Sequence, residues 1–288
     1  MSDSKGFFLA LGFAVALFSG CYEPQDGCLD LDAVNYDFSA DNNAPDDCQY
    51  PELRIQFRHR YSTGDTIYTF RLSDSVYLDE SGNPFTVERF QFFISETLLT
   101  TQAGEALNVE DELDIFLENP AGGLVLETVP DNFALATAGN SSPITLGTLR
   151  SSGDLTSVSF FVGVNSQANF AIADSIPPAH PLGLTDSLLY FNRDSGYVFQ
   201  LIQLNRDTTV ADTIPETLRI GTFANLQQVE LPVMSEKVPG FHLKLVVDID
   251  YRKWLAGINV QEDSKEELQS IIVGNTAEAF SLSEIVLE

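Results

Sequence analysis

One stretch of the chain alternates strictly between two kinds of side chain. From Leu53 to Tyr61 every second residue is apolar or aromatic, with His59 among them, and arginine or glutamine fills the places between. Successive side chains of a β-strand point to opposite faces of a sheet, so a period of two predicts a strand with one buried face. The pattern therefore favours a β-sheet fold and places His59 on the apolar face of its strand.

Further short segments rich in β-branched and aromatic residues follow, and turn signals such as Ser81–Pro84 separate them. The expected strands are Thr66–Leu72, Thr86–Leu98, Leu113–Leu117, Leu124–Val129, Ser157–Val164, Tyr197–Leu204, Thr217–Ile220, Gln228–Pro232, Phe241–Ile249 and Ala279–Leu287. Two short C-terminal helices are expected over Asp250–Ala256 and around Ser264–Val273, where Ser264 and Glu267 form a capping box. The sequence predicts an all-β fold, an antiparallel β-sandwich with one or two short C-terminal helices.

The N-terminus has the layout of a secretory signal peptide. Lys5 precedes an almost wholly apolar run, Gly6–Phe18, and small residues then lead to Cys21. The run is too short to span a bilayer, which needs roughly 20 apolar residues. The ending resembles a bacterial lipobox, which implies that Cys21 becomes the lipidated first residue of an exported protein anchored to the outer membrane, on its periplasmic face or at the cell surface. The alternative is an ordinary signal peptide with an incidental cysteine.

Charge limits the partners that the chain can bind. The 42 acidic residues outnumber the 15 basic ones, and the formal net charge is −27. Nucleic-acid binding relies on Lys and Arg to neutralise phosphates, so a nucleic-acid partner is not expected. An anionic membrane surface would also repel this chain, so we expect the lipid to provide its membrane contact. Cations would be attracted, although solubility alone accounts for most of this charge.

A small acidic module follows the signal peptide, over residues 21–50, and a β-sandwich domain is expected over 51–288. An exported chain folds in an oxidising compartment, so Cys28 and Cys48 are expected to form a disulfide. The module resembles the calcium-binding Asp-rich repeats of thrombospondin type 3, through Gly27, Cys28, Asp30, Ala33, Asn35, Tyr36, Asp46 and Cys48. This resemblance implies a calcium site at Asp30, Asp32, Asp37 and Asp41. The alternative is a solvated spacer closed by the disulfide.

Several landmarks occur in order from Leu53 to the C-terminus. They are Ile55-x-Phe57-x-His59, Tyr77–Gly82 followed by Val87–Ser95, Val158–Asn165 with Asn169, and His180–Leu182 followed by Ser195–Phe199. In this order they resemble the MbnP-like family of methanobactin-associated copper-binding proteins. The resemblance implies copper as a cofactor, held by histidines that an oxidised tryptophan assists in some members.

The chain departs from the family pattern where the metal ligands are expected. The family's Trp-x-Trp block reads Phe191-Asn192-Arg193 here, and Arg219 stands where the family commonly has a histidine. An arginine cannot deprotonate to ligate copper near neutral pH. His59 alone stands at a family histidine, and it is either the remaining copper ligand or a hydrogen-bonded core residue. His242 is expected to be exposed and Trp254 to lie in the core.

No pattern of a catalytic nucleophile or phosphate-binding loop is found, so an enzyme is not expected. Two functions remain. The first is a non-enzymatic, membrane-anchored binding or interaction module with a degenerate metal site. The alternative is a copper-binding, metal-acquisition lipoprotein that acts with an outer-membrane transporter.

Overall fold

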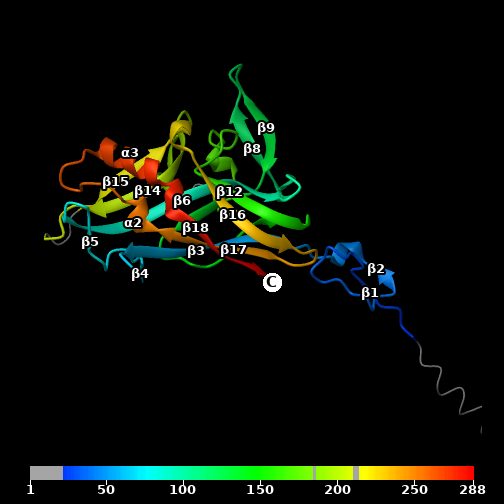
Figure 1. Cartoon of the computed structure of the whole chain (residues 1–288). Coiled ribbons are helices and arrows are strands. Elements are labelled where there is room, and N and C mark those ends of the chain that lie inside the picture. The colour runs from blue at the N-terminus through cyan, green and yellow to red at the C-terminus, as the bar shows by residue number, and fades with distance from the viewer. Residues whose placement is uncertain (1–21, 184–185, 210–213) are drawn as a thin grey trace, which may run out of the picture.

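The computed structural model describes residues 22–183, 186–209 and 214–288. Two β-sheets face each other across a shared apolar core (Figure 1). The expected signal peptide and Cys21 lie outside the described residues. In the part of the chain that is described, no helix is long and apolar enough to cross a membrane.

The larger sheet has nine strands. They are β5 (Tyr77–Leu78), β6 (Pro84–Thr101), β7 (Ala106–Leu107), β10 (Ala134–Thr137), β12 (Gly153–Val162), β13 (Tyr190–Asn192), β14 (Gly196–Asn205), β15 (Glu216–Gly221) and β16 (Gln227–Lys237). The strand order is β13-β14-β6-β12-β16, with β5, β7 and β10 paired to β6 and β15 paired to β14. All of these pairs are antiparallel. The long strand β6 thus organises the larger sheet.

The smaller sheet has five strands. They are β3 (Glu52–Thr63), β4 (Thr66–Thr69), β11 (Ile144–Thr148), β17 (Leu243–Asp250) and β18 (Phe280–Leu287), in the order β11-β3-β17-β18 with β4 paired to β3. Its central pair, β3 and β17, is parallel, and His59 lies opposite Ile249. Parallel strands need a long crossover connection, and here the strands of the larger sheet lie between them in the sequence. The predicted antiparallel sandwich is confirmed, with this parallel pair within it.

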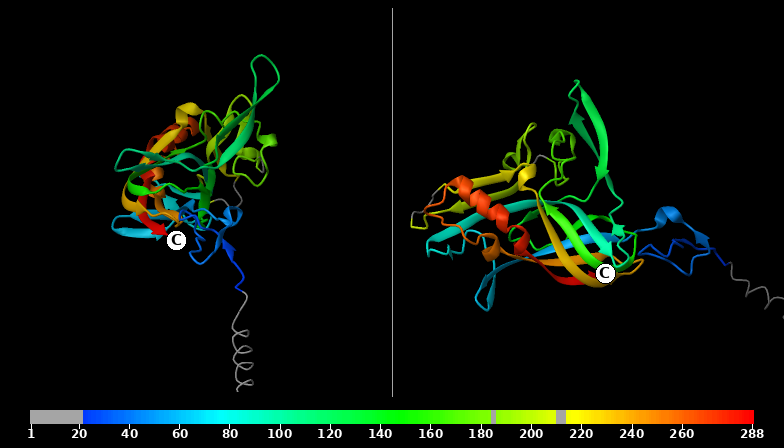
Figure 2. Two further views of the ribbon diagram at one scale, coloured as in Figure 1. Left: turned by 90° about the vertical axis from the view of Figure 1, so that its right-hand side faces the viewer. Right: turned by 45° about the horizontal axis from the view of Figure 1, so that its top comes forward.

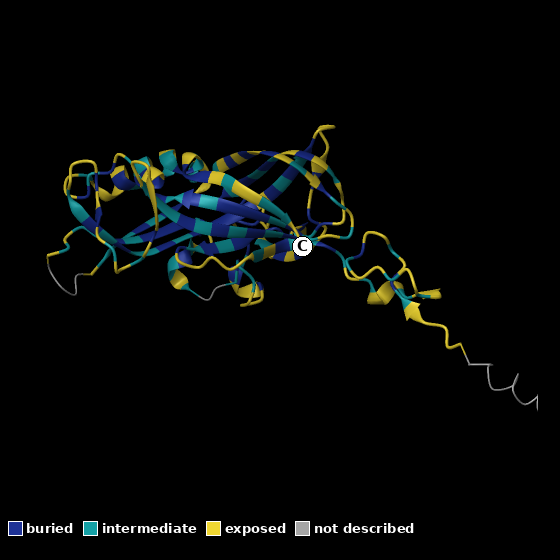
Figure 3. Ribbon diagram, turned by 60° about the horizontal axis from the view of Figure 1, so that its bottom comes forward, coloured by how far each residue is buried: buried dark blue, intermediate teal, exposed yellow. Residues whose placement is uncertain are grey.

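The alternation along β3 is confirmed. Leu53, Ile55, Phe57 and His59 are buried, and the residues between them are partly exposed. Figure 3 shows the same alternation of buried and partly exposed residues along the strands. These apolar faces meet the apolar face of the larger sheet, as in the edge-on contact of Phe57 with the ring of a β6 phenylalanine. Burial of apolar surface between the two sheets is therefore the main stabilising force of the sandwich.

Two short α-helices lie before the last strand. Helix α2 (Tyr251–Trp254) begins after Asp250, whose side chain accepts a hydrogen bond from the Arg252 backbone N–H. Helix α3 (Lys265–Asn275) begins with the predicted capping box of Ser264 and Glu267. Short 3-10 helices are η1 (Pro45–Asp47), η2 (Ala173–Ser175), η3 (Ser187–Leu189), η4 (Phe223–Asn225) and η5 (Ala277–Ala279). Helix α2 packs against β3 and α3 against β15, so both helices cover the sandwich.

The single tryptophan, Trp254, is fully buried in helix α2, as expected. Its ring centroid lies 4.8 Å from that of Phe90, 5.1 Å from that of Phe92 and 5.1 Å from that of Phe280. The indole N–H donates a hydrogen bond to the Thr276 hydroxyl at 3.1 Å. Since its ring packs on both sheets and its N–H is bonded, Trp254 has a structural role in the core.

Five strands of the sandwich were not expected from the sequence: β5, β7, β10, β11 and β13. Strand β10 carries two alanines, which favour strands weakly, and it pairs along β6. Strand β11 is broken by a register shift between Thr145 and Gly147. Gly147 has a φ of 137°, and a Cβ there would lie 2.8 Å from an Asp111 carboxylate oxygen. Glycine is therefore required at this bulge, and the bulge obscures the alternation that would identify the strand.

Strands β8 (Glu112–Glu118) and β9 (Leu124–Pro130) form a separate two-stranded antiparallel sheet. This hairpin projects away from the sandwich, as Figures 1 and 2 show. The lower part of the hairpin is anchored by Ile115 and Val129, which are buried in a second apolar cluster. Leu124 and Leu126, nearer the tip, are exposed.

The acidic N-terminal module lies at one end of the sandwich (Figure 2). Strands β1 (Asp26–Gly27) and β2 (Asn42–Asn43) form a short parallel pair, and the predicted disulfide joins Cys28 to Cys48 with a Cα–Cα distance of 5.0 Å. The module has few buried apolar residues, with Cys28 and Ala33 among them. The cross-link and local hydrogen bonds therefore hold this segment together in place of an apolar core.

Candidate functional site

His59, which the sequence resemblance suggested as the remaining copper ligand, lies in the core. Its side chain projects from β3 between the sheets, and the residue is 4% exposed. Both ring nitrogens have partners: Nε2 lies 2.9 Å from the carbonyl oxygen of Asn140, and Nδ1 lies 2.9 Å from the hydroxyl of Tyr251. A carbonyl can only accept, so Nε2 carries the proton. Nδ1 is then the acceptor, and the Tyr251 hydroxyl donates to it.

This arrangement keeps the imidazole of His59 neutral. Burial lowers the pKa of His59, and the hydrogen bond with the Asn140 carbonyl only partly opposes that effect. Burial also raises the pKa of Tyr251 well above its ordinary value, so its hydroxyl keeps the proton that it donates. The lone pair of Nδ1 is therefore occupied by a hydrogen bond, and a metal ion could use it only by displacing the tyrosine.

Arg219, which the sequence resemblance placed where the family commonly has a histidine, is held by its own surroundings. Its guanidinium carbon lies 4.5 Å from the ring centroid of Phe191, a cation–π contact. The guanidinium also donates hydrogen bonds to the carbonyl oxygens of Leu188 and Tyr190. At this position the chain therefore has a stacked and hydrogen-bonded cation, which cannot bind a metal ion as an imidazole would.

Arg193 lies at a different place from Arg219. It pairs with Glu118 of the projecting hairpin at 3.0 Å and lines a pocket with Phe170, whereas Arg219 lines another pocket beside α3. The two arginines therefore do not share a pocket, and the carboxylate that pairs with Arg193 is Glu118 rather than the neighbouring Asp194. The segment Phe191-Asn192-Arg193 contains no imidazole or thiolate ligand.

The other two histidines are engaged elsewhere. His180 accepts a hydrogen bond from the Leu182 N–H at Nδ1 and donates from Nε2 to an Asp131 carboxylate oxygen at 2.9 Å. His242 accepts at Nδ1 from the Glu52 N–H at 2.9 Å and is half-buried. The expectation that His242 is exposed is therefore wrong, because the start of β3 covers it. Each imidazole has a separate structural partner.

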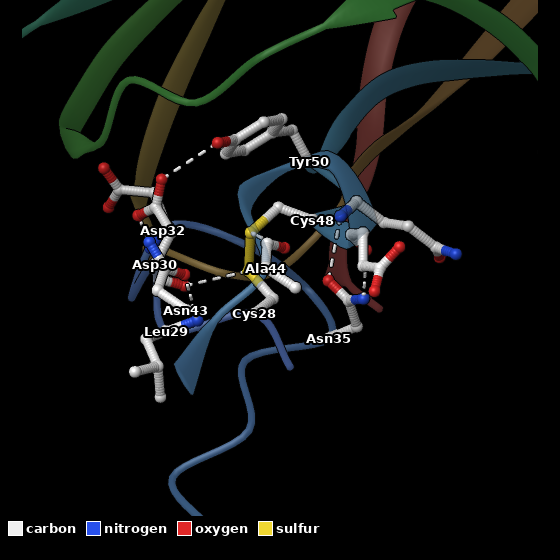
Figure 4. Close-up of a disulfide and its surroundings, with 11 residues drawn as sticks. Cys28, Leu29, Asp30, Asp32, Asn35, Asn43, Ala44, Cys48 and Tyr50 are labelled. Atoms are coloured by element: carbon white, nitrogen blue, oxygen red, sulfur yellow. Dashed lines mark hydrogen bonds between the residues drawn. A yellow bond between two sulfur atoms is a disulfide. The ribbon is translucent and has the colours of Figure 1, made fainter. Parts of the chain in front are cut away.

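In the acidic module, Asp30 is bonded within the protein. Its carboxylate accepts hydrogen bonds from the Asp32 backbone N–H at 3.0 Å and from the Tyr50 hydroxyl at 3.0 Å, as Figure 4 shows. These bonds, the one from Asp32 first, lower the pKa of Asp30. Tyr50 also stacks under Arg150, whose guanidinium carbon lies 4.5 Å from the ring centroid. The Asp30 carboxylate thus helps to join the module to the sandwich.

Asp37 and Asp41 are engaged in separate contacts. The Asp37 carboxylate accepts from the hydroxyl and the backbone N–H of Ser39, which lower its pKa. The Asp41 carboxylate accepts from the Gln25 N–H at 2.9 Å. Within residues 22–183, 186–209 and 214–288, no group of three or more His, Cys, Asp or Glu side chains could hold a metal ion. The structure does not gather the four predicted aspartates around one point.

Comparisons with known proteins identify the family. The sequence model of the MbnP family matches residues 50–272. The chain belongs to the MbnP family. A solved structure, MbnP from Methylosinus trichosporium, is similar over 75% of this chain and 86% of that chain, with 11% identity and a TM-score of 0.42. No curated protein matches the chain.

Copper is the cofactor that MbnP membership implies, and the described residues do not fit it. Tight copper sites gather several imidazole or thiolate ligands in one place. Here the Nδ1 lone pair of His59 is occupied by Tyr251, and Arg219 stacks on Phe191 with no imidazole between them. The chain belongs to the MbnP family, but its described residues do not assemble a set of donor atoms for copper.

A pocket that the sequence did not predict lies between β3, β4, β5 and α2. It has a volume of about 880 Å³, and its lining includes Tyr61, Tyr77, Arg71 and Arg252. Tyr61 belongs to the alternating strand, but no local pattern connects it with Arg252, which follows it by most of the chain length. Only the parallel pairing of β3 with β17, which leads directly into α2, brings these residues together.

Proposed function

We propose that this chain is a non-enzymatic binding or interaction module of the MbnP family whose family copper site is degenerate. The observation that carries the proposal is the environment of His59. Its Nε2 proton is donated to the Asn140 carbonyl and its Nδ1 lone pair accepts from Tyr251, both at 2.9 Å. A ligand histidine needs one ring nitrogen with a lone pair directed at the metal. His59 acts as a hydrogen-bonded core residue instead.

The surroundings of Arg219 support the same proposal. Arg219 stacks on Phe191 and bonds to two backbone carbonyls, so a permanent cation occupies this position. A cation here would repel a metal ion, since the contacts of Arg219 are with neutral groups. Copper binding would require both His59 and this segment to rearrange.

Membrane attachment through lipid at Cys21 is part of the proposal. The lipobox-like sequence supports it, and the acidic module at residues 22–50 would then lie between the lipid and the sandwich. In this arrangement the module acts as a disulfide-closed spacer, and the sandwich faces the periplasm or the cell exterior. A surface protein or an outer-membrane transporter is the kind of partner that such a position makes accessible.

The second candidate function is copper acquisition, which family membership favours. The test is the copper content of full-length protein purified without chelator and loaded with one equivalent of copper, before and after dialysis against a chelator. We expect well under one copper per chain to survive dialysis. His242→Ala is the matched control, because it also removes an imidazole, one that lies just before β17 and away from His59.

One copper per chain that survives chelation in the wild type and in His242→Ala, and is absent in His59→Ala, would refute the proposal. The wild-type measurement decides the question even if His59→Ala folds poorly, because retained copper alone contradicts a degenerate site. Copper that is retained equally by the wild type and both variants would also contradict it, since a metal site would then exist elsewhere in the chain.

A further inference from the structure

The pocket beside β4 and α2 has features of a ligand site. It lies at the end of the sandwich opposite the acidic N-terminal module, where Figure 1 shows β4, β5 and α2 together. Its volume of about 880 Å³ is within the range of small-molecule sites. Tyrosine side chains and two arginines, Arg71 and Arg252, are part of its lining.

The two arginines are unusual for this acidic chain. Most of its arginines pair with a carboxylate, as Arg58 does with Asp248 and Arg206 with Glu216. Among the described residues, no carboxylate oxygen lies within 4.0 Å of a guanidinium nitrogen of Arg71 or Arg252. The contact of the Arg252 guanidinium is a long one, 3.5 Å to the Ser62 carbonyl. Both cations are therefore available to an anion in the pocket.

The carboxylates that line the pocket are already hydrogen-bonded. Asp79 accepts from the backbone and side-chain N–H groups of Asn83 and from the Val260 N–H, at 2.7 to 3.0 Å. Burial raises the pKa of Asp79, but these bonds outweigh it and the pKa is lowered. Glu80 accepts from the Gly257 N–H at 3.3 Å. These carboxylates bond to turns of the chain, and neither forms an ion pair with Arg71 or Arg252.

Aromatic rings form the apolar part of the pocket. The ring centroids of Tyr61 and Tyr77 lie 4.5 Å apart, and Tyr77 stacks on the buried Phe70 at 5.0 Å. Burial raises the pKa of Tyr61, and the charge of Arg252, which lines the same pocket, opposes that rise. Leu78 lines the same pocket and is exposed. A ligand would cover apolar surface here that the protein leaves in water.

The position of Arg71 is fixed by its backbone. The Arg71 N–H donates to the Tyr77 hydroxyl at 2.8 Å, and that hydroxyl donates to the Arg71 carbonyl at 2.9 Å. Arg252 is placed by the cap of α2, since its N–H bonds to Asp250. These bonds fix the points on the backbone from which the two arginine side chains extend at the pocket.

We infer that this pocket binds a small organic anion that has an aromatic or aliphatic body. Arg71 and Arg252 take its carboxylate or other oxyanion by charge-assisted hydrogen bonds, and the body lies against Tyr61 and Tyr77. The inference goes beyond the proposed function, because it concerns a site apart from His59 and holds whether or not copper binds. Its location far from the module leaves it accessible in a protein anchored by its N-terminus.

The test is calorimetric titration of the full chain carrying Cys21→Ser, which removes the expected lipid and so avoids detergent. The probes are 2-naphthoate and its neutral isostere 2-naphthamide, which differ in charge and share one aromatic body. We expect 2-naphthoate to bind at least tenfold more tightly than 2-naphthamide, and more weakly as salt is added. Arg71→Gln and Arg252→Gln should each weaken 2-naphthoate binding about tenfold and leave 2-naphthamide binding unchanged.

Lys253→Gln is the matched control, because it removes one exposed positive charge next to Arg252 without altering the pocket lining. It should leave both affinities within about twofold of wild type. The inference is overturned if 2-naphthoate fails to bind, if it binds no more tightly than 2-naphthamide, or if all three substitutions weaken it equally. None of these outcomes bears on copper content, so this test and that of the proposed function fail separately.

Discussion

Replacement of His59 by alanine tests the structural role of this residue. His59 is 4% exposed, and its imidazole accepts a hydrogen bond from the hydroxyl of Tyr251, which is fully buried. The substitution removes this imidazole. The hydroxyl then has no partner in the core and no access to water. The Asn140 carbonyl loses its partner too, but Asn140 is exposed, so water can replace the imidazole there. The main penalty therefore falls on Tyr251.

The expected loss of stability follows from these contacts. An unsatisfied buried hydroxyl costs about 1–3 kcal/mol. The space left by the ring adds about 2 kcal/mol, as for other large-to-small changes in a core. We expect His59→Ala to lower the free energy of unfolding by about 3–5 kcal/mol. Tyr251→Phe in the same chain removes the unsatisfied hydroxyl, so the double variant should be less destabilised than the sum of the single variants by about 1–2 kcal/mol.

The assay is denaturant unfolding followed by the fluorescence of Trp254, the single tryptophan, which packs beside Tyr251 with a centroid distance of 6.0 Å. The midpoint and slope give the free energy of unfolding for the wild type, both single variants and the double variant. A decrease in the free energy of unfolding of less than about 1 kcal/mol for His59→Ala would refute the reasoning, because a buried hydroxyl without a partner costs more than that. Strict additivity of the two substitutions would refute the coupling through the hydrogen bond.

Four further predictions concern pH, lipid and the acidic module. The folded pKa of His59 lies below its ordinary value of 6.5, so the unfolded chain binds the proton more readily. The contribution of His59 to stability should therefore be full above pH 6.5 and fall as the pH decreases towards the folded pKa. His59→Phe should abolish this pH dependence, which denaturant unfolding at several pH values would measure. Cys21→Ser should release the protein from the membrane fraction, and a mutant that still pellets with membranes would show that lipid is not the anchor. Cys28→Ser with Cys48→Ser should destabilise the module by roughly 3 kcal/mol and speed proteolysis of residues 29–47, whereas unchanged cleavage would mean that the disulfide is dispensable. Calcium and chelator should give equal proteolysis of residues 29–47 in the wild type, because Asp carboxylates there bond locally; protection by calcium would restore the calcium site.

Local patterns in the sequence were sufficient for most of the fold. The alternation from Leu53 to Tyr61 predicted β3, because side-chain direction in a strand depends only on the backbone. The capping box of Ser264 and Glu267 predicted the start of α3, since a cap involves residues within one turn. Strand β11 was missed because Gly147 interrupts its register and hides the period. The parallel pairing of β3 with β17 has no local signal at all.

The candidate site was also predictable from the sequence only in part. The sequence by itself determined that positions 191 and 219 carry Phe and Arg, which are not copper ligands, and that His59 stands on an apolar strand face, since these are facts of residue type and spacing. The tertiary structure alone decided what His59 does, because its partners are far from it in the chain: Asn140 by 81 residues and Tyr251 by 192.

The pocket of Arg71 and Arg252 was likewise decided by the tertiary structure. An arginine in a sequence does not reveal whether a carboxylate will lie beside it, because side chains from distant strands set its electrostatic surroundings. Only the packing of α2 beside β3 and β4 shows that these two cations line one pocket and that its carboxylates are bonded elsewhere. Residue type determines which charges the chain has, and the fold determines which of them remain unpaired.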